Sequence, residues 1–213
     1  MERGALALKN QKSKARAVIR LLRKRFPHAG IVLHYQNPWE LMVAVQLSAQ
    51  CTDKKVNEVT EKLFKKYQTL DDYARADRQT FERDIHATGF YRNKTKNILA
   101  AAKMLKEEFG GRLPRTMDEL LRLPGVGRKT ANVVLGNVYG VTDGIAVDTH
   151  VRRLSRRLGL THHSDPEKIE RDLMRIVPKK DWFTLTYLLI DYGRASCPAR
   201  RHDHEKCLLR KYE

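Results

Sequence analysis

A turn with two glycines, followed at once by two cations, is the part of this sequence best suited to chemistry. Residues 123–129 read Leu-Pro-Gly-Val-Gly-Arg-Lys. Gly125 and Gly127 permit the backbone angles of a tight turn, and their missing side chains let N–H groups approach a phosphate at the positive start of the next helix. Arg128 opens that helix. Such a contact grips a nucleic-acid backbone and reads no bases.

Lys129 is a candidate nucleophile, and the alternative is a solvated surface lysine of the kind that this basic chain has at many other positions. Positive partial charge surrounds a lysine in the first turn of a helix, and partial desolvation further disfavours its ammonium form. The neutral amine can attack a sugar carbon and form a Schiff base. Asp148 either caps a helix predicted over 149–158 or stabilises developing positive charge and moves protons, and the two roles are compatible. His150 either orients that carboxylate, contacts a phosphate, or is a structural helix residue.

Helix signals surround these residues. Thr116 to Glu119 form a capping box, and the apolar residues after Lys129 recur at helical spacing, so residues 116–138 predict two helices joined as an αα-hairpin. Asn37 caps a run over 41–49 that is apolar nearly all round, which predicts a buried central helix. Residues 182–192 predict another apolar helix, with Gly193 as its end.

Strand signals are sparse. Residues 31–35 and 144–147 are short candidates, and no obvious turn pairs them. We therefore expect an all-α protein of about ten helices. If there are two lobes, the chain crosses between them near Gly30 and Val141.

Composition points to a polyanionic partner. The formal net charge is +17, and basic residues recur along the whole chain. Such a field attracts nucleic acid and releases counterions on binding. No apolar run approaches the roughly 20 residues of a membrane span, and the first residues lack the apolar stretch of a secretory signal. An anionic membrane surface is the second candidate partner, but no segment has the pattern of a basic amphipathic anchor, so we expect no membrane partner. Three cysteines form no disulfide framework, which fits a reducing compartment.

Together these motifs resemble the endonuclease III family of base-excision repair glycosylases. The match covers roughly residues 15–210, and its segments are 47–53, 89–94, 123–131 and 147–151. The resemblance implies two helical lobes with DNA bound in the cleft between them. One is a six-helix barrel over 31–141 that contains the helix-hairpin-helix at 116–138. The other joins residues 1–30 to 142–213.

The resemblance also implies an activity. It predicts a bifunctional enzyme that removes damaged bases, oxidised pyrimidines first, and cleaves the abasic site by β-elimination through Lys129, with Asp148 as the catalytic aspartate. Its partner is duplex DNA with damaged bases or abasic sites, and we expect a cytoplasmic, nucleoid-associated monomer. One alternative is another glycosylase specificity, for mismatched thymine or a damaged purine. The other is a non-catalytic DNA-binding module, which the presence of both Lys129 and Asp148 argues against.

Two further residues are assigned through the resemblance. The target base must be flipped out of the duplex at a cost of a few kcal/mol. The resemblance implies that Gln50 fills the vacated space, where its amide can bond to the orphaned base, and that Phe90 wedges into the opposite strand. This wedge is often aliphatic in the family, and the alternative for Phe90 is packing in the core.

The sequence departs from the family near its C-terminal end. Many members hold a [4Fe–4S] cluster on cysteines spaced C-x6-C-x2-C-x5-C, and aligning Cys197 with the first places His204, Cys207 and Glu213 at the others. Two thiolates are missing. The sequence therefore predicts no cofactor and a metal-free loop over 198–206. A zinc site built from Cys197, His202 or His204, and Cys207 is the chemically reasonable alternative.

Overall fold

The protein is described here by a computed structural model that covers residues 2–213. Within this range it contains eleven α-helices, four short 3₁₀ helices and no strand, so the expectation of an all-α fold is confirmed. The two strand candidates, 31–35 and 144–147, are irregular links between helices. None of the described helices has the length and apolar character needed to cross a membrane.

The chain divides into two compact units. One joins Met1–Ile31 to Thr142–Glu213, and the other is Val32–Val141. Each unit buries apolar side chains of its own: Leu22, Val151 and Leu188 in the first, and Met42, Leu120 and Val134 in the second. The two units are therefore described one at a time.

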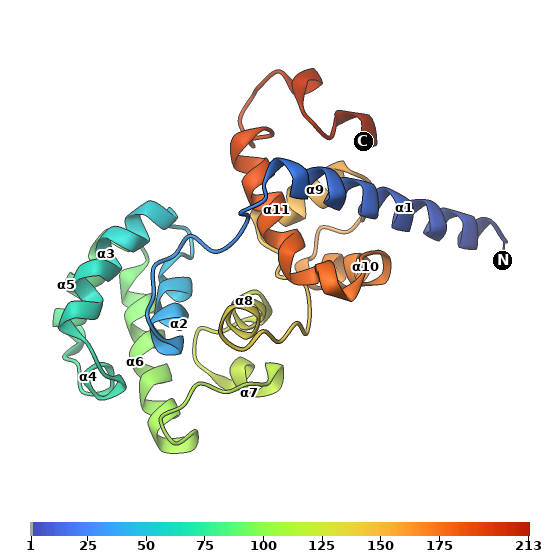
Figure 1. Cartoon of the computed structure of the whole chain (residues 1–213). Helices are drawn as coiled ribbons and strands as arrows, with labels where there is room; N and C mark the ends of the chain where they lie inside the picture. The colour runs from blue at the N-terminus through green and yellow to red at the C-terminus, as the bar shows by residue number, and fades with distance from the viewer. Residues whose placement is uncertain (1) are drawn as a thin grey trace. The chain divides into compact units, whose positions relative to one another are not determined.

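The unit Val32–Val141 is built around one buried helix, α2 (Pro38–Leu47), whose residues from Glu40 to Leu47 are all buried. Asn37 begins this helix by accepting a hydrogen bond from the Glu40 amide at 2.9 Å. Helices α3, α6 and α8 contact α2 on different sides, as Figure 1 shows. The remaining helices of the unit are α3 (Asp53–Lys66), α4 (Leu70–Ala74), α5 (Arg78–Ile85), α6 (Tyr91–Glu108), α7 (Met117–Arg122) and α8 (Arg128–Tyr139).

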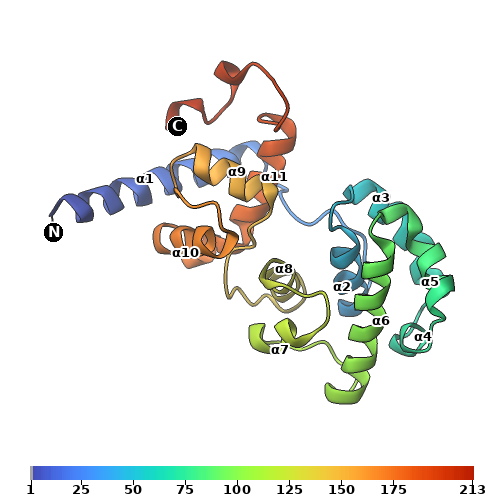
Figure 2. The ribbon, with the colours of Figure 1, turned by 180° about the vertical axis from the view of Figure 1, so that it is seen from behind.

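The other unit contains the first helix and the last three. Its helices are α1 (Glu2–Arg25), α9 (Thr149–Arg157), α10 (Pro166–Ile176) and α11 (Trp182–Ala195). Helix α11 packs against α1 and α9, and α10 also contacts both of these (Figure 2). Beyond α11 the chain continues through two short turns of 3₁₀ helix, His204–Lys206 and Arg210–Tyr212.

Gly193 does not end its helix, contrary to the sequence-based prediction. Helix α11 continues to Ala195. A Cβ at Gly193 would overlap Nδ1 of His150 and lie 3.2 Å from a guanidinium nitrogen of Arg153, both on α9. The glycine therefore marks a place where two helices approach closely, which a sequence pattern cannot distinguish from a helix terminus.

Candidate functional site

The hairpin predicted from sequence is present. Helix α7 ends at Arg122, α8 begins at Arg128, and the Val126 amide closes the turn between them by donating to the Leu123 carbonyl at 3.1 Å. The side chains of Leu123 and Val126 are buried beneath the turn. The buried side chain of Gln46, on α2, donates to the Pro124 carbonyl at 3.4 Å. The turn is thus fastened to the central helix and not only to its own two helices.

The two glycines of this turn meet different surroundings. Gly125 has a φ of +77°, and a Cβ there would lie 2.8 Å from Cβ of Asn97 on α6. The fold itself therefore requires a glycine at 125. Gly127 has a φ of −104°, which any residue adopts, and a Cβ there would meet open space. Packing among the described residues does not require a glycine at 127, although glycine suits the N-cap of α8, and close approach of an outside ligand would add a second reason for it.

Lys129 is the second residue of α8 and is half-buried. No side chain caps the start of this helix, because its N-cap residue is Gly127. The first-turn N–H groups consequently keep the capacity to bind an anion, and the helix dipole favours one there. Arg128, also half-buried, opens the same turn.

Asp148 belongs to the other unit, at the start of α9. Its Oδ1 accepts a hydrogen bond from the Val151 amide at 2.8 Å, so the residue is the N-cap of that helix. The cap uses one carboxylate oxygen, Oδ1, and the second oxygen, Oδ2, takes no part in it. His150, two residues on, is half-buried and packs against Gly193 of α11. Its proposed contact with DNA stays a prediction.

Gln50 and Phe90 share an unusual backbone. They are the two non-glycine residues with positive φ in the described part of the chain, at 53° and 49°. Side chains in this region cost of order 1–3 kcal/mol, and such strain concentrates at functional sites. Both residues are exposed, Phe90 by 64%, so the alternative that Phe90 packs in the core is wrong.

One buried lysine connects the segments that carry these two residues. Lys94, on the first turn of α6, has a side chain directed inward, and its Nζ donates to the Leu47 carbonyl at 2.7 Å and to the Thr88 carbonyl at 2.8 Å. Burial lowers the pKa of this amine. Leu47 is the last residue of α2, three before Gln50, and Thr88 is two before Phe90. Lys94 was missed as a functional candidate because its pattern resembles that of a solvated lysine.

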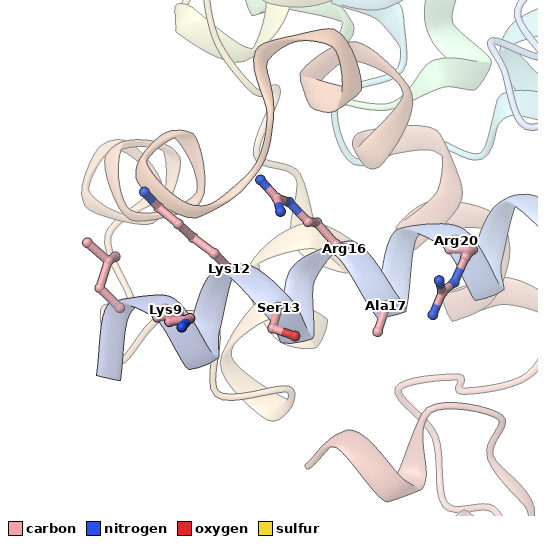
Figure 3. Close-up of a pocket in the computed structure, with 7 residues that line it drawn as sticks. Lys9, Lys12, Ser13, Arg16, Ala17 and Arg20 are labelled. Atoms are coloured by element: carbon pink, nitrogen blue, oxygen red, sulfur yellow. The ribbon is translucent and has the colours of Figure 1, made fainter. Parts of the chain in front are cut away.

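A basic face runs along α1 in the first unit. Lys9, Lys12, Arg16 and Arg20 are exposed and line a shallow surface hollow with Leu8, Ser13 and Ala17. Figure 3 shows Lys12 and Arg16 extending from the same side of the helix. Among the residues whose side chains the structure describes, no carboxylate, thiol or imidazole lines this hollow. It therefore attracts anions and offers no catalytic group.

The prediction of a metal-free, cofactor-free loop over 198–206 is wrong. One ligand atom from each of Cys197, His202, His204 and Cys207 lies within 4.8 Å of the others, as in a site that could hold a metal ion. Both cysteines are buried and both imidazoles half-buried. The four-cysteine spacing led to the wrong prediction, whereas the alternative built from Cys197, His202 or His204, and Cys207 names the residues that come together.

Comparisons with known proteins agree with these features. Residues 43–179 match the model of the HhH-GPD superfamily of base excision DNA repair proteins. Over 200 residues the chain is 50% identical to endonuclease III of Synechocystis sp., covering 94% of this chain and 91% of that protein. Over 185 residues it is 50% identical to endonuclease III of Bacillus subtilis, covering 86% and 84% of the two chains.

Solved structures extend the likeness to three dimensions. The chain is similar to an endonuclease III in a trapped covalent intermediate with DNA, with a TM-score of 0.89 and 45% identity over 93% of each chain. A non-covalent complex of endonuclease III with DNA gives a TM-score of 0.90 and 44% identity over 94% of each chain. A thermostable thymine-DNA glycosylase, at 21% identity and a TM-score of 0.79, shares the fold.

Proposed function

Because the chain belongs to the HhH-GPD superfamily of base excision DNA repair proteins, and within it to the endonuclease III family, we propose that it excises damaged bases from duplex DNA and then cuts the strand at the abasic site. The observation that carries this proposal is Lys129 at the uncapped start of α8, in a chain 45% identical to an endonuclease III trapped as a covalent intermediate with DNA. A covalent intermediate requires a nucleophile, and Lys129 stands where phosphate-binding N–H groups can hold the backbone beside it.

The chemistry assigned to Lys129 is redox-neutral. Its Nζ forms a bond to C1′ of the sugar as the bond from C1′ to the base breaks, and the base leaves with that electron pair and takes up a proton. The sugar ring opens to give an imine between Lys129 and C1′. Loss of a proton from C2′ then expels the 3′ phosphate oxygen and cuts the strand, and water releases the lysine by hydrolysis of the imine.

Asp148 complements the lysine in this proposal. Its carboxylate can stabilise positive charge that develops on the sugar as the base departs, and it can carry protons to or from the lysine or the leaving base. Because its cap bond uses Oδ1 alone, the carboxylate can hold its helix and serve the reaction with Oδ2. Lys129 and Asp148 belong to different units, and their cooperation is part of the proposal.

Opening of the duplex is assigned to Gln50 and Phe90. The exposed Phe90 ring can unstack a base step, and the Gln50 amide can bond to the base left without a partner. Both residues hold strained backbones that face no apolar core, which supports a role outside folding. The substrate is duplex DNA, and we expect the enzyme to act where that DNA lies, at the nucleoid.

Covalent trapping tests the nucleophile. Duplex with an abasic site is incubated with the protein and borohydride, which reduces an imine to a stable amine. Wild type and Lys103→Ala, a change of an exposed lysine on α6, are expected to be trapped on DNA. Lys129→Ala is expected to bind the duplex and remain untrapped. Equal trapping of Lys129→Ala would end the assignment.

The base specificity is tested with a panel of duplexes. Oxidised pyrimidine, a G·T mismatch and 8-oxoguanine are compared, each in the same sequence context. We expect release of the oxidised pyrimidine and a strand break without added base, because an imine formed by Lys129 can serve both base release and strand cleavage. Release of thymine or 8-oxoguanine alone would favour the alternative glycosylase, and release of no base with intact binding would favour a non-catalytic module.

A further inference from the structure

The donor atoms of a group of cysteine and histidine side chains beyond α11 are spaced much like the ligands of one tetrahedrally coordinated ion. Sγ of Cys197 lies 3.9 Å from Nδ1 of His204, which lies 3.4 Å from Nε2 of His202. That nitrogen lies 3.2 Å from Sγ of Cys207. Zinc bonds of 2.3 Å to sulfur and 2.0–2.1 Å to nitrogen give ligand separations of about 3.3–3.8 Å in a tetrahedron. These three separations are close to that range, and all four donor atoms lie within 4.8 Å of one another, so a small contraction of the group would let them surround one ion.

The second nitrogen of each imidazole is already held by an oxygen. Nδ1 of His202 lies 2.9 Å from the Arg200 carbonyl oxygen. Nε2 of His204 lies 2.8 and 2.7 Å from the two carboxylate oxygens of Glu213. Carbonyl and carboxylate oxygens accept hydrogen bonds, so these nitrogens carry the protons. The nitrogens that face the thiols, Nε2 of His202 and Nδ1 of His204, then present lone pairs, as metal-bound imidazoles do.

The surroundings of Cys197 suit a thiolate ligand. Nη1 of Arg157 lies 3.5 Å from Sγ of Cys197, and Nη1 of Arg153 lies 3.8 Å from it. Cys207 is buried on the same core as Cys197. Two thiolates, two neutral imidazoles and a divalent cation sum to zero charge, which suits a half-buried position better than an uncompensated ion. Glu213 takes no ligand position, because His204 and Arg157 hold its carboxylate.

The same residues do not fit the four-iron cluster that the family resemblance implies. A cluster of that kind is held by thiolates on separate irons, which spreads its ligands further apart than ligands of one ion. Here two of the four positions are histidine and glutamate, and the four donor atoms that do converge lie within 4.8 Å of one another. Two cysteines and two histidines form a closed structural zinc set.

We propose that Cys197, His202, His204 and Cys207 bind one Zn²⁺ ion that fastens residues 196–213 to α11 and α9. The ion plays no part in the reaction at Lys129. It replaces, by one closed tetrahedral site, the cross-link that an iron–sulfur cluster would supply in this segment. Its contribution is to folding, because the ligands converge only when the segment is packed on the core of its unit.

The metal content of the protein tests this proposal directly. The full chain is purified without oxygen from medium that contains both iron and zinc, without a metal-affinity tag, and analysed for both metals. We expect about one zinc per chain, and a Co²⁺-exchanged sample with the visible bands of a tetrahedral site with thiolate ligands. About four irons per chain with a brown absorbance would overturn the proposal, and so would a protein with neither metal.

Substitutions assign the ligands. Cys207→Ser and His202→Asn are expected to lose the zinc, whereas Cys51→Ser and His162→Asn, which change a cysteine and an exposed histidine outside the group, are expected to keep it. If a ligand variant fails to fold, the wild-type protein is treated with a chelator instead, and its unfolding temperature tests the proposal. Its unfolding temperature is expected to fall and to recover with Zn²⁺ but not Mg²⁺. An unchanged unfolding temperature after the metal is removed would contradict the structural role, and zinc retained by His202→Asn would contradict the ligand set.

Discussion

At the scale of single residues, Gly125 and Gly127 differ in what the fold requires of them, and the proposed function gives Gly127 a role in binding DNA. The positive φ at Gly125 and its contact with Asn97 belong to the protein alone. Gly127 has an ordinary φ and open surroundings, so the packing of the protein does not require a glycine at this position. Alanine substitutions at these two positions are therefore expected to differ in effect, the first on stability and the second on DNA binding.

Gly125→Ala is expected to destabilise the fold, and Gly127→Ala to weaken binding. Gly125→Ala places a side chain on left-handed backbone at a cost of about 1–2 kcal/mol. The overlap of the new Cβ with Asn97 adds to this cost. At about 2–4 °C per kcal/mol for a chain of this size, its unfolding temperature should fall by several degrees. Gly127→Ala should unfold near the wild-type temperature and bind undamaged duplex about tenfold more weakly, through loss of one hydrogen bond to a charged group. Thermal melts and titrations measure both, and a reversed pattern would contradict the division of roles.

Asp148 caps α9 in the structure and has a catalytic role in the proposed function, and two substitutions can separate these roles. Asn is as good an N-cap as Asp, so Asp148→Asn should keep the Val151 bond and the unfolding temperature while it removes the negative charge. We expect it to lower base excision on the order of 10²-fold or more. Asp148→Ala should lose about 1 kcal/mol of stability in addition. Full activity of a stable Asn variant would limit Asp148 to the cap.

At the scale of elements, Lys94 joins the end of α2 to the start of α6. Its buried amine satisfies two carbonyls that would otherwise lack a donor, and these belong to the segments that hold Gln50 and Phe90. Under the proposed function, in which Gln50 and Phe90 open the duplex, we expect Lys94 to act as a positioning residue for that step.

Lys94→Met should impair base flipping more than chemistry. Its side chain keeps the length and loses the donor, which leaves two buried carbonyls unsatisfied at about 1–3 kcal/mol each. We expect a smaller rise in 2-aminopurine fluorescence when the variant binds duplex, and near-normal borohydride trapping on an abasic site already unpaired in a bulge. Lys96→Met, an exposed lysine two residues away, is the control. Equal losses on paired and bulged substrates would point to general unfolding instead.

Sequence patterns predicted these elements well where local chemistry decides them. The Asn37 cap, the capping residue Thr116 and the apolar stripe of α8 depend on neighbouring residues alone, and all are present. The metal group depends on a chain return that brings residues 197 and 207 together, and the role of Gly193 depends on a distant helix. Both features depend on residues that are far apart in the sequence, so residue spacing alone led to wrong predictions about the loop over 198–206 and about Gly193. The strain at Gln50 and Phe90 has no sequence signature either.

At the scale of the whole molecule, charge dominates. The chain has a formal net charge of +17, and the exposed face of α1 carries Lys9, Lys12, Arg16 and Arg20. A field of this sign raises the local concentration of DNA and lets the protein bind undamaged duplex while it searches for a lesion.

Affinity for undamaged duplex should therefore fall steeply with salt. Each phosphate neutralised contributes a slope of about −0.9 to the plot of log affinity against log salt. We expect a linear decrease that corresponds to several phosphates between low and physiological salt. Lys129→Ala should show nearly the same slope, because the grip involves many cations. A flat plot would show that the charge serves solubility and not binding.

Helix α6 also sets a limit on how this protein can change length. Phe90 precedes its first residue, Lys94 ties down its first turn, and Asn97 lies beneath Gly125 on the next. One inserted residue would rotate everything after it by about 100° and advance it by about 1.5 Å. Phe90 and the turn at Gly125 would then no longer keep their relative positions, even if every side chain were kept. Insertions and deletions should be tolerated in the loops around α4 and rejected between residues 90 and 97.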